Sequence, residues 1–264
     1  MPHLLPDDLL DRIRCKLSTT DVENIVGFLG YGNPKESVWF IGIEEGLGGA
    51  DSADAVENLK ARGAFAPIMD LREAHHGKLR EGGAPINFDV RPPRTQVWQW
   101  IAKIMRAYQG RNDWKDVNCA NEYIRCSLGR YNGMTFLTEL QSIPSNNTRN
   151  RAYTQAFNNL LGDKLDERLA KRQEGLLDLL DSSRPRTVIC YGDGQMRARQ
   201  YETFFDAEWT PIGARIARDS KRAYPFLLLP FFGNGQMKGS VIEELFKRGF
   251  LPGPGSRCQA ERRE

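Results

Sequence analysis

Two adjacent acidic residues, Glu44 and Glu45, stand between the mostly apolar residues 38–43 and Gly46. Such a short apolar run is typical of a strand buried on both faces of a parallel sheet. In open α/β sheets the functional groups lie just beyond the carboxyl ends of these strands. A carboxylate there can stabilise a developing positive charge or orient a water molecule. The pair is therefore a candidate catalytic site, with a polar turn that caps the next helix as the alternative.

Three further apolar runs, at residues 134–140, 187–191 and 226–230, also end in polar residues or glycine. Helical spacing of apolar residues marks the segments around them. We expect these helices at about residues 6–17, 95–108, 165–180, 195–205 and 241–248. The repeated order of strand, polar loop and helix predicts an α/β fold with three α/β/α layers around a central, mostly parallel four-stranded sheet. The loops after its strands should converge on one edge.

The length of 264 residues and the hydrophobic content of 40% suffice for one large domain. We expect a single α/β domain over residues 1–251. Within it, residues 47–94 form a long, irregular, glycine-rich insertion. Residues 252–264 are rich in proline, glycine and arginine, and we expect a flexible tail there.

The composition excludes several classes of protein. No apolar stretch approaches the length of a membrane span, and the net charge of +3 neither requires nor excludes a nucleic-acid partner. The five cysteines are scattered without a C-x-x-C, which argues against a disulfide framework. His75 and His76 are adjacent but lack further ligands at metal-site spacing. We therefore expect a cytoplasmic monomer that uses no metal or cofactor and does not contact a membrane.

The order of these strand ends resembles the uracil-DNA glycosylase superfamily. The resemblance covers about residues 36–248 and places Glu44 at the position of the family's catalytic residue. Each motif is weak by itself, and the common order carries the resemblance. The four matching stretches are Gly42-Ile43-Glu44-Glu45-Gly46, residues 136–144, Val188-Ile189-Cys190-Tyr191-Gly192, and residues 228–236.

This sequence departs from the family pattern in three places. Glu45 replaces the proline of the first motif, and no histidine lies near the last strand. Glu139 stands where the family has an asparagine that reads the base. Some members hold an iron–sulfur cluster through four cysteines, but the cysteines here lack the close pairing that such a cluster needs.

The resemblance implies a DNA glycosylase, which flips a base out of DNA and hydrolyses its N-glycosidic bond to leave an abasic site. Glu44 would stabilise the sugar cation and orient the attacking water, and Glu45 would share that role or support the loop. Two alternatives stay open. One is an inactive member of the superfamily that binds DNA or a nucleotide, and the other is a nucleoside hydrolase or transferase. A P-loop nucleotide site is disfavoured because no G-x-x-x-x-G-K-[ST] occurs.

The prediction of which base is recognised rests on Glu139. Gln141 and Tyr191 are expected to be further base-recognition residues. A carboxylate only accepts hydrogen bonds, so it would repel the O4 of uracil and suit the exocyclic amine of a cytosine. Because unmodified cytosine is everywhere in cellular DNA, we expect a modified cytosine foreign to the host, such as hydroxymethyl- or glucosyl-hydroxymethylcytosine of phage DNA. An antiviral role would follow. A strand-end salt bridge, or an alignment shifted by one residue, is the alternative for Glu139.

Contacts with DNA are expected from two loops at the same sheet edge. Amides, hydroxyls and cations in these loops suit phosphates, and one of the two aromatic rings would wedge into the base stack unless both belong to the core. The expected DNA-binding residues are Asn146, Asn147, Arg149, Arg151, Phe231, Phe232, Asn234, Gln236 and Lys238. A second basic cluster, Arg215, Arg218, Lys221 and Arg222, is either a further contact or a solvated face.

Overall fold

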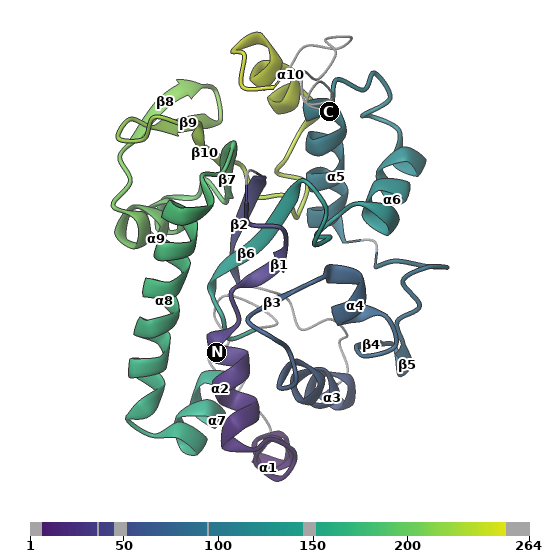
Figure 1. Cartoon of the computed structure of the whole chain (residues 1–264), viewed down its shortest axis with the longest axis vertical. Helices are drawn as coiled ribbons and strands as arrows, with labels where there is room; N and C mark the ends of the chain where they lie inside the picture. The colour runs from purple at the N-terminus through teal and green to yellow at the C-terminus, as the bar shows by residue number, and fades with distance from the viewer. Residues whose placement is uncertain (1–6, 36, 45–51, 94, 145–151, 252–264) are drawn as a thin grey trace.

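The computed structural model describes residues 7–35, 37–44, 52–93, 95–144 and 152–251 (Figure 1). Helices and strands alternate along the chain around one large mixed sheet of eight strands, in the order β3-β1-β6-β2-β7-β10-β9-β8. The expected α/β class is confirmed. The strands of this sheet are β1 (Gly30–Gly32), β2 (Val38–Glu44), β3 (Ile68–Met69), β6 (Thr135–Gln141), β7 (Thr187–Tyr191), β8 (Trp209–Gly213), β9 (Ile216–Asp219) and β10 (Phe226–Leu229).

The prediction of a four-stranded, mostly parallel sheet was wrong, because the sheet has eight strands and mixes parallel with antiparallel pairs. The four predicted strands form the centre of the sheet, where β6, β2, β7 and β10 run parallel. Short strands extend both edges: β1 pairs antiparallel with β6, and β9 pairs antiparallel with β10. Strands β1 and β3 have only three and two residues, and β8 and β9 contain polar residues or proline, so none of the four shows the apolar run of a buried central strand.

The helices cover both faces of the sheet and one end of it. Figure 1 shows α8 along one side and α5 and α6 on the other, with α1, α2, α3 and α7 grouped below. Their bounds are α1 (Asp7–Lys16), α2 (Thr19–Gly27), α3 (Ser52–Arg62), α4 (Leu71–His75), α5 (Gln96–Tyr108), α6 (Val117–Cys126), α7 (Ala152–Leu161), α8 (Lys164–Ser183), α9 (Gln195–Phe205) and α10 (Gly239–Lys247). No helix in the described ranges is long and apolar enough to cross a membrane.

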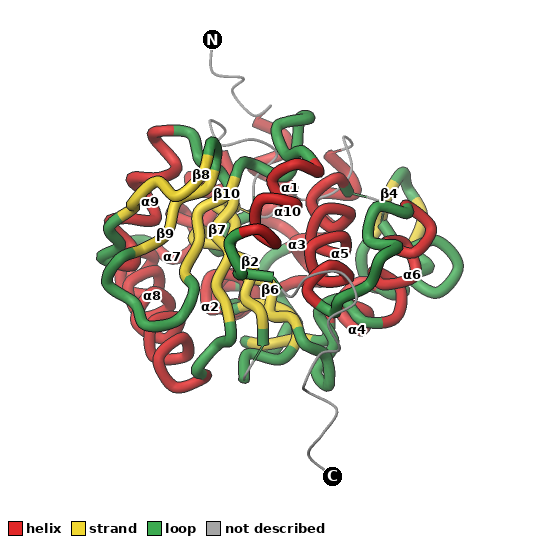
Figure 2. Tube along the Cα trace, turned by 90° about the horizontal axis from the view of Figure 1, so that it is seen from above, coloured by secondary structure: helices red, strands yellow, loops and turns green. Residues whose placement is uncertain are grey.

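The apolar core divides into three clusters, which follow from the alternation of side chains along the strands. Val38 and Phe40 of β2 pack with apolar residues of α4, α5, α6 and α10. Trp39 and Ile41 point to the opposite face and pack with residues of α8 and α9. The third cluster joins α1, α2, α3, α7 and the first turn of α8 without a strand. The view of Figure 2 shows the strands between these helical layers.

Several predicted elements are confirmed closely. Helices α1, α5, α8, α9 and α10 lie where apolar spacing placed them, and Thr95 caps α5 by accepting a hydrogen bond from the amide of Trp98 at 3.1 Å. Helix α8 ends at Arg184, whose positive φ of 49° interrupts the helix before Pro185.

The insertion expected to be irregular contains regular structure. Its described part includes α3, β3 and α4, and a small two-stranded sheet of β4 (Arg80–Glu81) and β5 (Ala84–Pro85). Strand β3 continues the large sheet by pairing with β1. Asp70 supports α4 by accepting hydrogen bonds from the amides of Arg72 and Glu73. The insertion is thus built into the edge of the fold.

Candidate functional site

The strand register brings the predicted polar residues to one edge of the sheet. Gly42 of β2 pairs with Glu139 of β6, and Glu44 pairs with Gln141. On the other side of β2, Ile41 pairs with Cys190 of β7, the residue before Tyr191. Because β2, β6 and β7 are parallel, their carboxyl ends meet there.

Gly42, Glu139 and Tyr191 form a compact group that we call the strand-end cluster. The hydroxyl of Tyr191 donates a hydrogen bond to Oε1 of Glu139 at 2.9 Å. A Cβ atom at position 42 would lie 1.8 Å from Oε2 of Glu139 and 2.5 Å from the Tyr191 hydroxyl. Only glycine therefore lets the carboxylate lie across the end of β2. The glycine of the first motif thus makes room for the carboxylate of the second.

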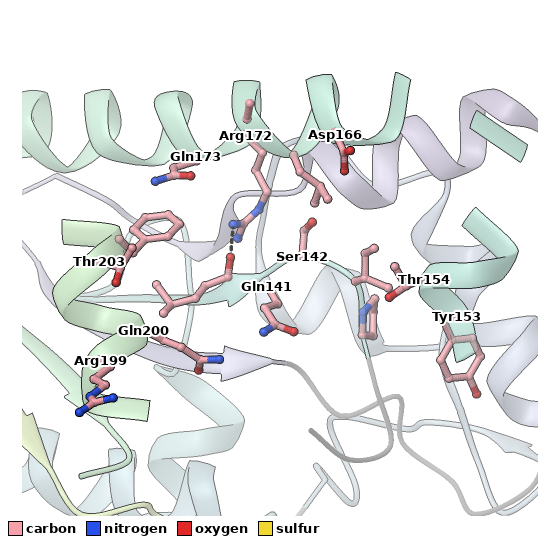
Figure 3. Close-up of a pocket in the computed structure, with 16 residues that line it drawn as sticks. Gln141, Ser142, Tyr153, Thr154, Asp166, Arg172, Gln173, Arg199, Gln200 and Thr203 are labelled. Carbon is pink, nitrogen blue, oxygen red and sulfur yellow. Dashed lines mark hydrogen bonds between the residues drawn. The ribbon is translucent and has the colours of Figure 1, made fainter. Parts of the chain in front are cut away.

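Arg172 of α8 fixes the end of β6 from the other side, and its side chain is 5% exposed. Its guanidinium donates hydrogen bonds to the main-chain oxygens of Phe28 at 2.8 Å, Leu140 at 2.8 Å and Glu139 at 2.6 Å. Figure 3 shows the side chain of Arg172 extending from α8 toward the end of β6. Burial lowers the pKa of Arg172 to about 10, while the negative charge of Glu139 opposes that shift. The arginine thus holds the strand that carries Glu139, through backbone contacts.

Two cavities adjoin this strand end. A small one of about 40 Å³ lies against Glu139 and Tyr31, and its volume accommodates a water molecule. A larger pocket of about 830 Å³ lies between the end of β6 and helices α7, α8 and α9 (Figure 3). Gln141, Ser142 and Arg172 line both.

The loops after β7 and β10 are joined next to the strand-end cluster. The ring of Tyr191 stacks on Phe232 with centroids 4.6 Å apart and an angle of 12° between the rings. Arg215, in the turn between β8 and β9, donates hydrogen bonds to both carboxylate oxygens of Asp193, at 3.0 and 2.8 Å. The same guanidinium donates to the main-chain oxygen of Gln236 at 2.9 Å. The side chain of Arg215 thus connects the loop after β7 with the loop after β10.

The predicted DNA-binding residues separate into three groups. Phe232 is fully buried against Tyr191, so its assignment as a surface wedge was wrong: this ring belongs to the core. Phe231 is partly exposed and lies under the guanidinium of Arg197, 4.3 Å from the ring centroid. Three of the predicted residues are exposed on the loop after β10, namely Asn234, Gln236 and Lys238.

Other predictions fall on residues that the structure does not describe. Among the catalytic residues, Glu45 lies outside the described ranges, and Glu44 is described only as the last residue of β2. Four predicted DNA-binding residues also lie outside these ranges: Asn146, Asn147, Arg149 and Arg151.

The second basic cluster proves to be largely neutralised. Arg215 pairs with Asp193, Lys221 with Asp206 at 2.8 Å, and Arg222 with the buried Asp219. These carboxylates occupy the donors that a phosphate would need. Of the two readings of this cluster, the solvated and structurally paired face is the better supported.

The structure adds polar residues near the site that were not predicted. Arg62 of α3 is buried and donates a hydrogen bond to the hydroxyl of Tyr31 at 3.0 Å. His75 is also buried, with Nδ1 2.9 Å from the main-chain oxygen of Leu71 and its ring 5.2 Å from that of Trp98. Within the described ranges, no three His, Cys, Asp or Glu side chains are grouped so that they could hold a metal ion.

A sequence signal for Arg172 exists. It lies on the buried stripe of α8 with Leu165, Leu176 and Leu180, where an arginine interrupts an otherwise apolar face.

Comparison with known proteins adds no identification: no protein-family model matches the chain, and no curated protein matches it either.

Proposed function

We propose that this protein is a DNA glycosylase of the uracil-DNA glycosylase type that excises a modified cytosine. The observation that carries the proposal is the strand-end cluster, in which Tyr191 and Gly42 position the carboxylate of Glu139, two residues along the register from the Glu44–Gln141 pair. The parallel centre of the sheet supports the fold part of the proposal, because the motif-bearing loops follow neighbouring strands.

The cluster favours a base with an exocyclic amine. The Tyr191 hydroxyl donates to Oε1 of Glu139, so the carboxylate acts as a hydrogen-bond acceptor in this cluster. An ionised carboxylate accepts hydrogen bonds and has none to donate, so it suits the amine of a cytosine better than the O4 of uracil. Gln141, at the exposed end of β6, supplies an amide that can both donate and accept.

The proposed reaction gives the catalytic role to Glu44, the last residue of β2. The bond between C1′ of the sugar and the base breaks, and its electron pair leaves with the base. A water molecule adds to C1′, and its proton passes to the carboxylate of Glu44 and then to the departing base. The same negative charge stabilises the cationic sugar of the transition state. Glu45 supports this role from the next position.

The biological setting belongs to the same proposal. The substrate is phage DNA that carries hydroxymethyl- or glucosyl-hydroxymethylcytosine, and the enzyme acts as a cytoplasmic monomer in antiviral defence. Excision is confined to bases foreign to the host, because removal of ordinary cytosine would destroy the host genome.

Abasic-site formation tests the function. Purified full-length protein is incubated with matched duplexes that contain uracil, cytosine, hydroxymethylcytosine or its glucosylated form, and hot alkali then cleaves any abasic site. We expect cleavage only at a modified cytosine. Glu44→Gln should retain DNA binding and lose at least about a hundredfold in single-turnover rate. The matched control Glu167→Gln, on the exposed face of α8, should keep the wild-type rate.

Each other outcome has a definite meaning. Cleavage at uracil would preserve the glycosylase and contradict the role of Glu139. Cleavage of no duplex would contradict the proposed function and favour an inactive DNA-binding fold or, if free nucleosides are cleaved, a nucleoside hydrolase. An unchanged rate in Glu44→Gln would remove Glu44 from the mechanism.

A further inference from the structure

The most exposed large apolar side chain in the described part of the chain is Met196, at 83% exposure. It lies in the first turn of α9, directly after the loop that follows β7. The other strongly exposed apolar residues lie elsewhere: Val90 in the segment between β5 and α5, Val117 at the start of α6, and Tyr131 before β6. Met196 is therefore the exposed apolar side chain at the carboxyl end of a central strand.

The next residue fixes the turn from which Met196 extends. The guanidinium of Arg197 lies 4.3 Å from the ring centroid of Phe231, which ties α9 to the loop after β10. Gly192 has a φ of 131°, and a Cβ there would come within 2.8 Å of Cδ of Arg197. The side chain of Arg197 thus packs against Phe231 and beside Gly192, while the side chain of Met196 extends into solvent.

The charges around this turn differ from those of the neighbouring hairpin. Arg215, Lys221 and Arg222 are paired with aspartates. Among the residues that the structure describes, by contrast, no carboxylate forms an ion pair with Arg197, Arg199 or Lys238. Arg199 and Lys238 are exposed and Arg197 is partly exposed. Such cations without a carboxylate partner, beside an apolar side chain, complement a duplex, which has phosphates outside and stacked bases inside.

We propose that Met196 enters the base stack of duplex DNA and occupies the space of the flipped nucleotide, while Arg197, Arg199 and Lys238 contact flanking phosphates. This inference rests on the proposed function and goes beyond it by assigning the wedge to the loop after β7. Methionine is unbranched and polarizable, so it adapts to the space between two base steps. The assignment also explains why Phe232 can stay in the core.

The test compares duplex and single-stranded substrates with the same modified cytosine. Met196→Ala should lower single-turnover excision from duplex DNA by about tenfold or more, because the wedge no longer offsets the unstacking of a paired base. Excision from the single strand should change little. Met196→Leu should restore most of the duplex rate, and Val117→Ala, which removes another exposed apolar side chain, should have no effect.

A second readout separates this inference from the proposed function. A duplex with 2-aminopurine beside the target position gains fluorescence when the neighbouring base is unstacked, whether or not a bond is cleaved. Wild-type protein should produce the gain and Met196→Ala should lose it. A gain in the wild type without excision would overturn the glycosylase and keep the wedge. Three results would overturn the wedge. They are an equal fluorescence gain with wild type and Met196→Ala, no fluorescence gain with the wild type, and an equal loss of excision by Met196→Ala on duplex and single-stranded DNA.

Discussion

The strand-end cluster and the β8–β9 hairpin use carboxylates in opposite ways. In the hairpin region Asp219 is fully buried and binds the guanidinium of Arg222, and Asp193 binds Arg215. In the strand-end cluster a neutral tyrosine hydroxyl donates to Glu139, and the nearby Arg172 binds main-chain oxygens. The first arrangement ties segments together, whereas the second positions a carboxylate at the edge where the motif-bearing loops meet.

This contrast separates stability from function. Carboxylates bound to guanidinium groups contribute to the folded state, most of all where the carboxylate is buried, as Asp219 is. A carboxylate held by a hydroxyl and by the shape of a glycine contributes mainly to what can bind beside it. Substitutions in the hairpin should therefore change the free energy of unfolding, and substitutions in the strand-end cluster should change excision.

The largest effect on stability is expected from Asp219→Ala. Its carboxylate accepts hydrogen bonds from the amide of Glu208 and from Arg222. Breaking a buried ion pair of this kind costs about 3–5 kcal/mol in the free energy of unfolding. Urea denaturation followed by circular dichroism measures the loss. Per folded molecule, excision at a temperature where the variant stays folded should equal that of the wild type, and a specific loss of excision would contradict the contrast.

The pH dependence of the same variant has a defined sign. Burial opposes the ionised form of Asp219, but the hydrogen bonds from Glu208, Arg222 and Lys221 outweigh it and hold the pKa below its ordinary 3.8. The stabilisation is therefore fully present above 3.8 and is lost as the pH falls through the folded-state pKa. As the pH falls from 3.8 through the folded-state pKa, the stability of Asp219→Ala should therefore change less than that of the wild type.

An intermediate effect is expected from Gly42→Ala. The new methyl group would overlap the carboxylate of Glu139, and such overpacking costs about 1–3 kcal/mol in stability. Excision should fall far more than stability, since the carboxylate must move. Gly175→Ala is the matched control: its Cβ would meet only Leu29, at 3.9 Å, and alanine favours a helix. Equal excision by both variants would show that the position of Glu139 is irrelevant.

The smallest effect on stability is expected from Tyr191→Phe. The ring keeps its stack on Phe232, but Glu139 loses the hydroxyl donor. A hydrogen bond to a charged group contributes about 1.5–3 kcal/mol, so excision should fall by about ten- to a hundredfold. Tyr131→Phe removes a hydroxyl that donates to Ile68, away from the cluster, and should leave the rate unchanged. An equal loss of excision in Tyr191→Phe and Tyr131→Phe would contradict a specific role of the hydrogen bond between Tyr191 and Glu139.

The sequence predicts β2, β7 and β10 well because each is largely a continuous apolar run, and it predicts β6 although Thr138 and Glu139 interrupt its apolar residues. It fails at β1, which consists of Gly30, Tyr31 and Gly32. Those glycines would be taken as a turn, yet a Cβ at either position would come within 2.4 Å of a main-chain oxygen of β6. The close approach of two strands separated by 100 residues cannot be read from local pattern.

The contacts within the candidate site could not be predicted from the sequence for the same reason. Residue type and position at a strand end singled out Glu139 and Tyr191, but their hydrogen bond joins residues 52 positions apart and depends on the sheet order. Phe231 and Phe232 are indistinguishable as sequence, and only packing shows that one is buried and the other lies under Arg197. The sequence likewise does not show which cations are paired. In the structure Arg215, Lys221 and Arg222 bind aspartates, whereas Arg197, Arg199 and Lys238 form no ion pair with a described carboxylate.

The most direct test of the central claim, that Glu139 reads an exocyclic amine, is the ratio of single-turnover excision rates for modified cytosine and uracil in otherwise identical duplexes. Glu139→Asn supplies an amide that both accepts and donates, and Glu139→Gln does so at the original length. We expect the ratio to shift toward uracil by at least about tenfold in one of these variants, as a mismatched hydrogen-bond partner typically costs 1–3 kcal/mol. A ratio equal to that of the wild type in both would contradict the account.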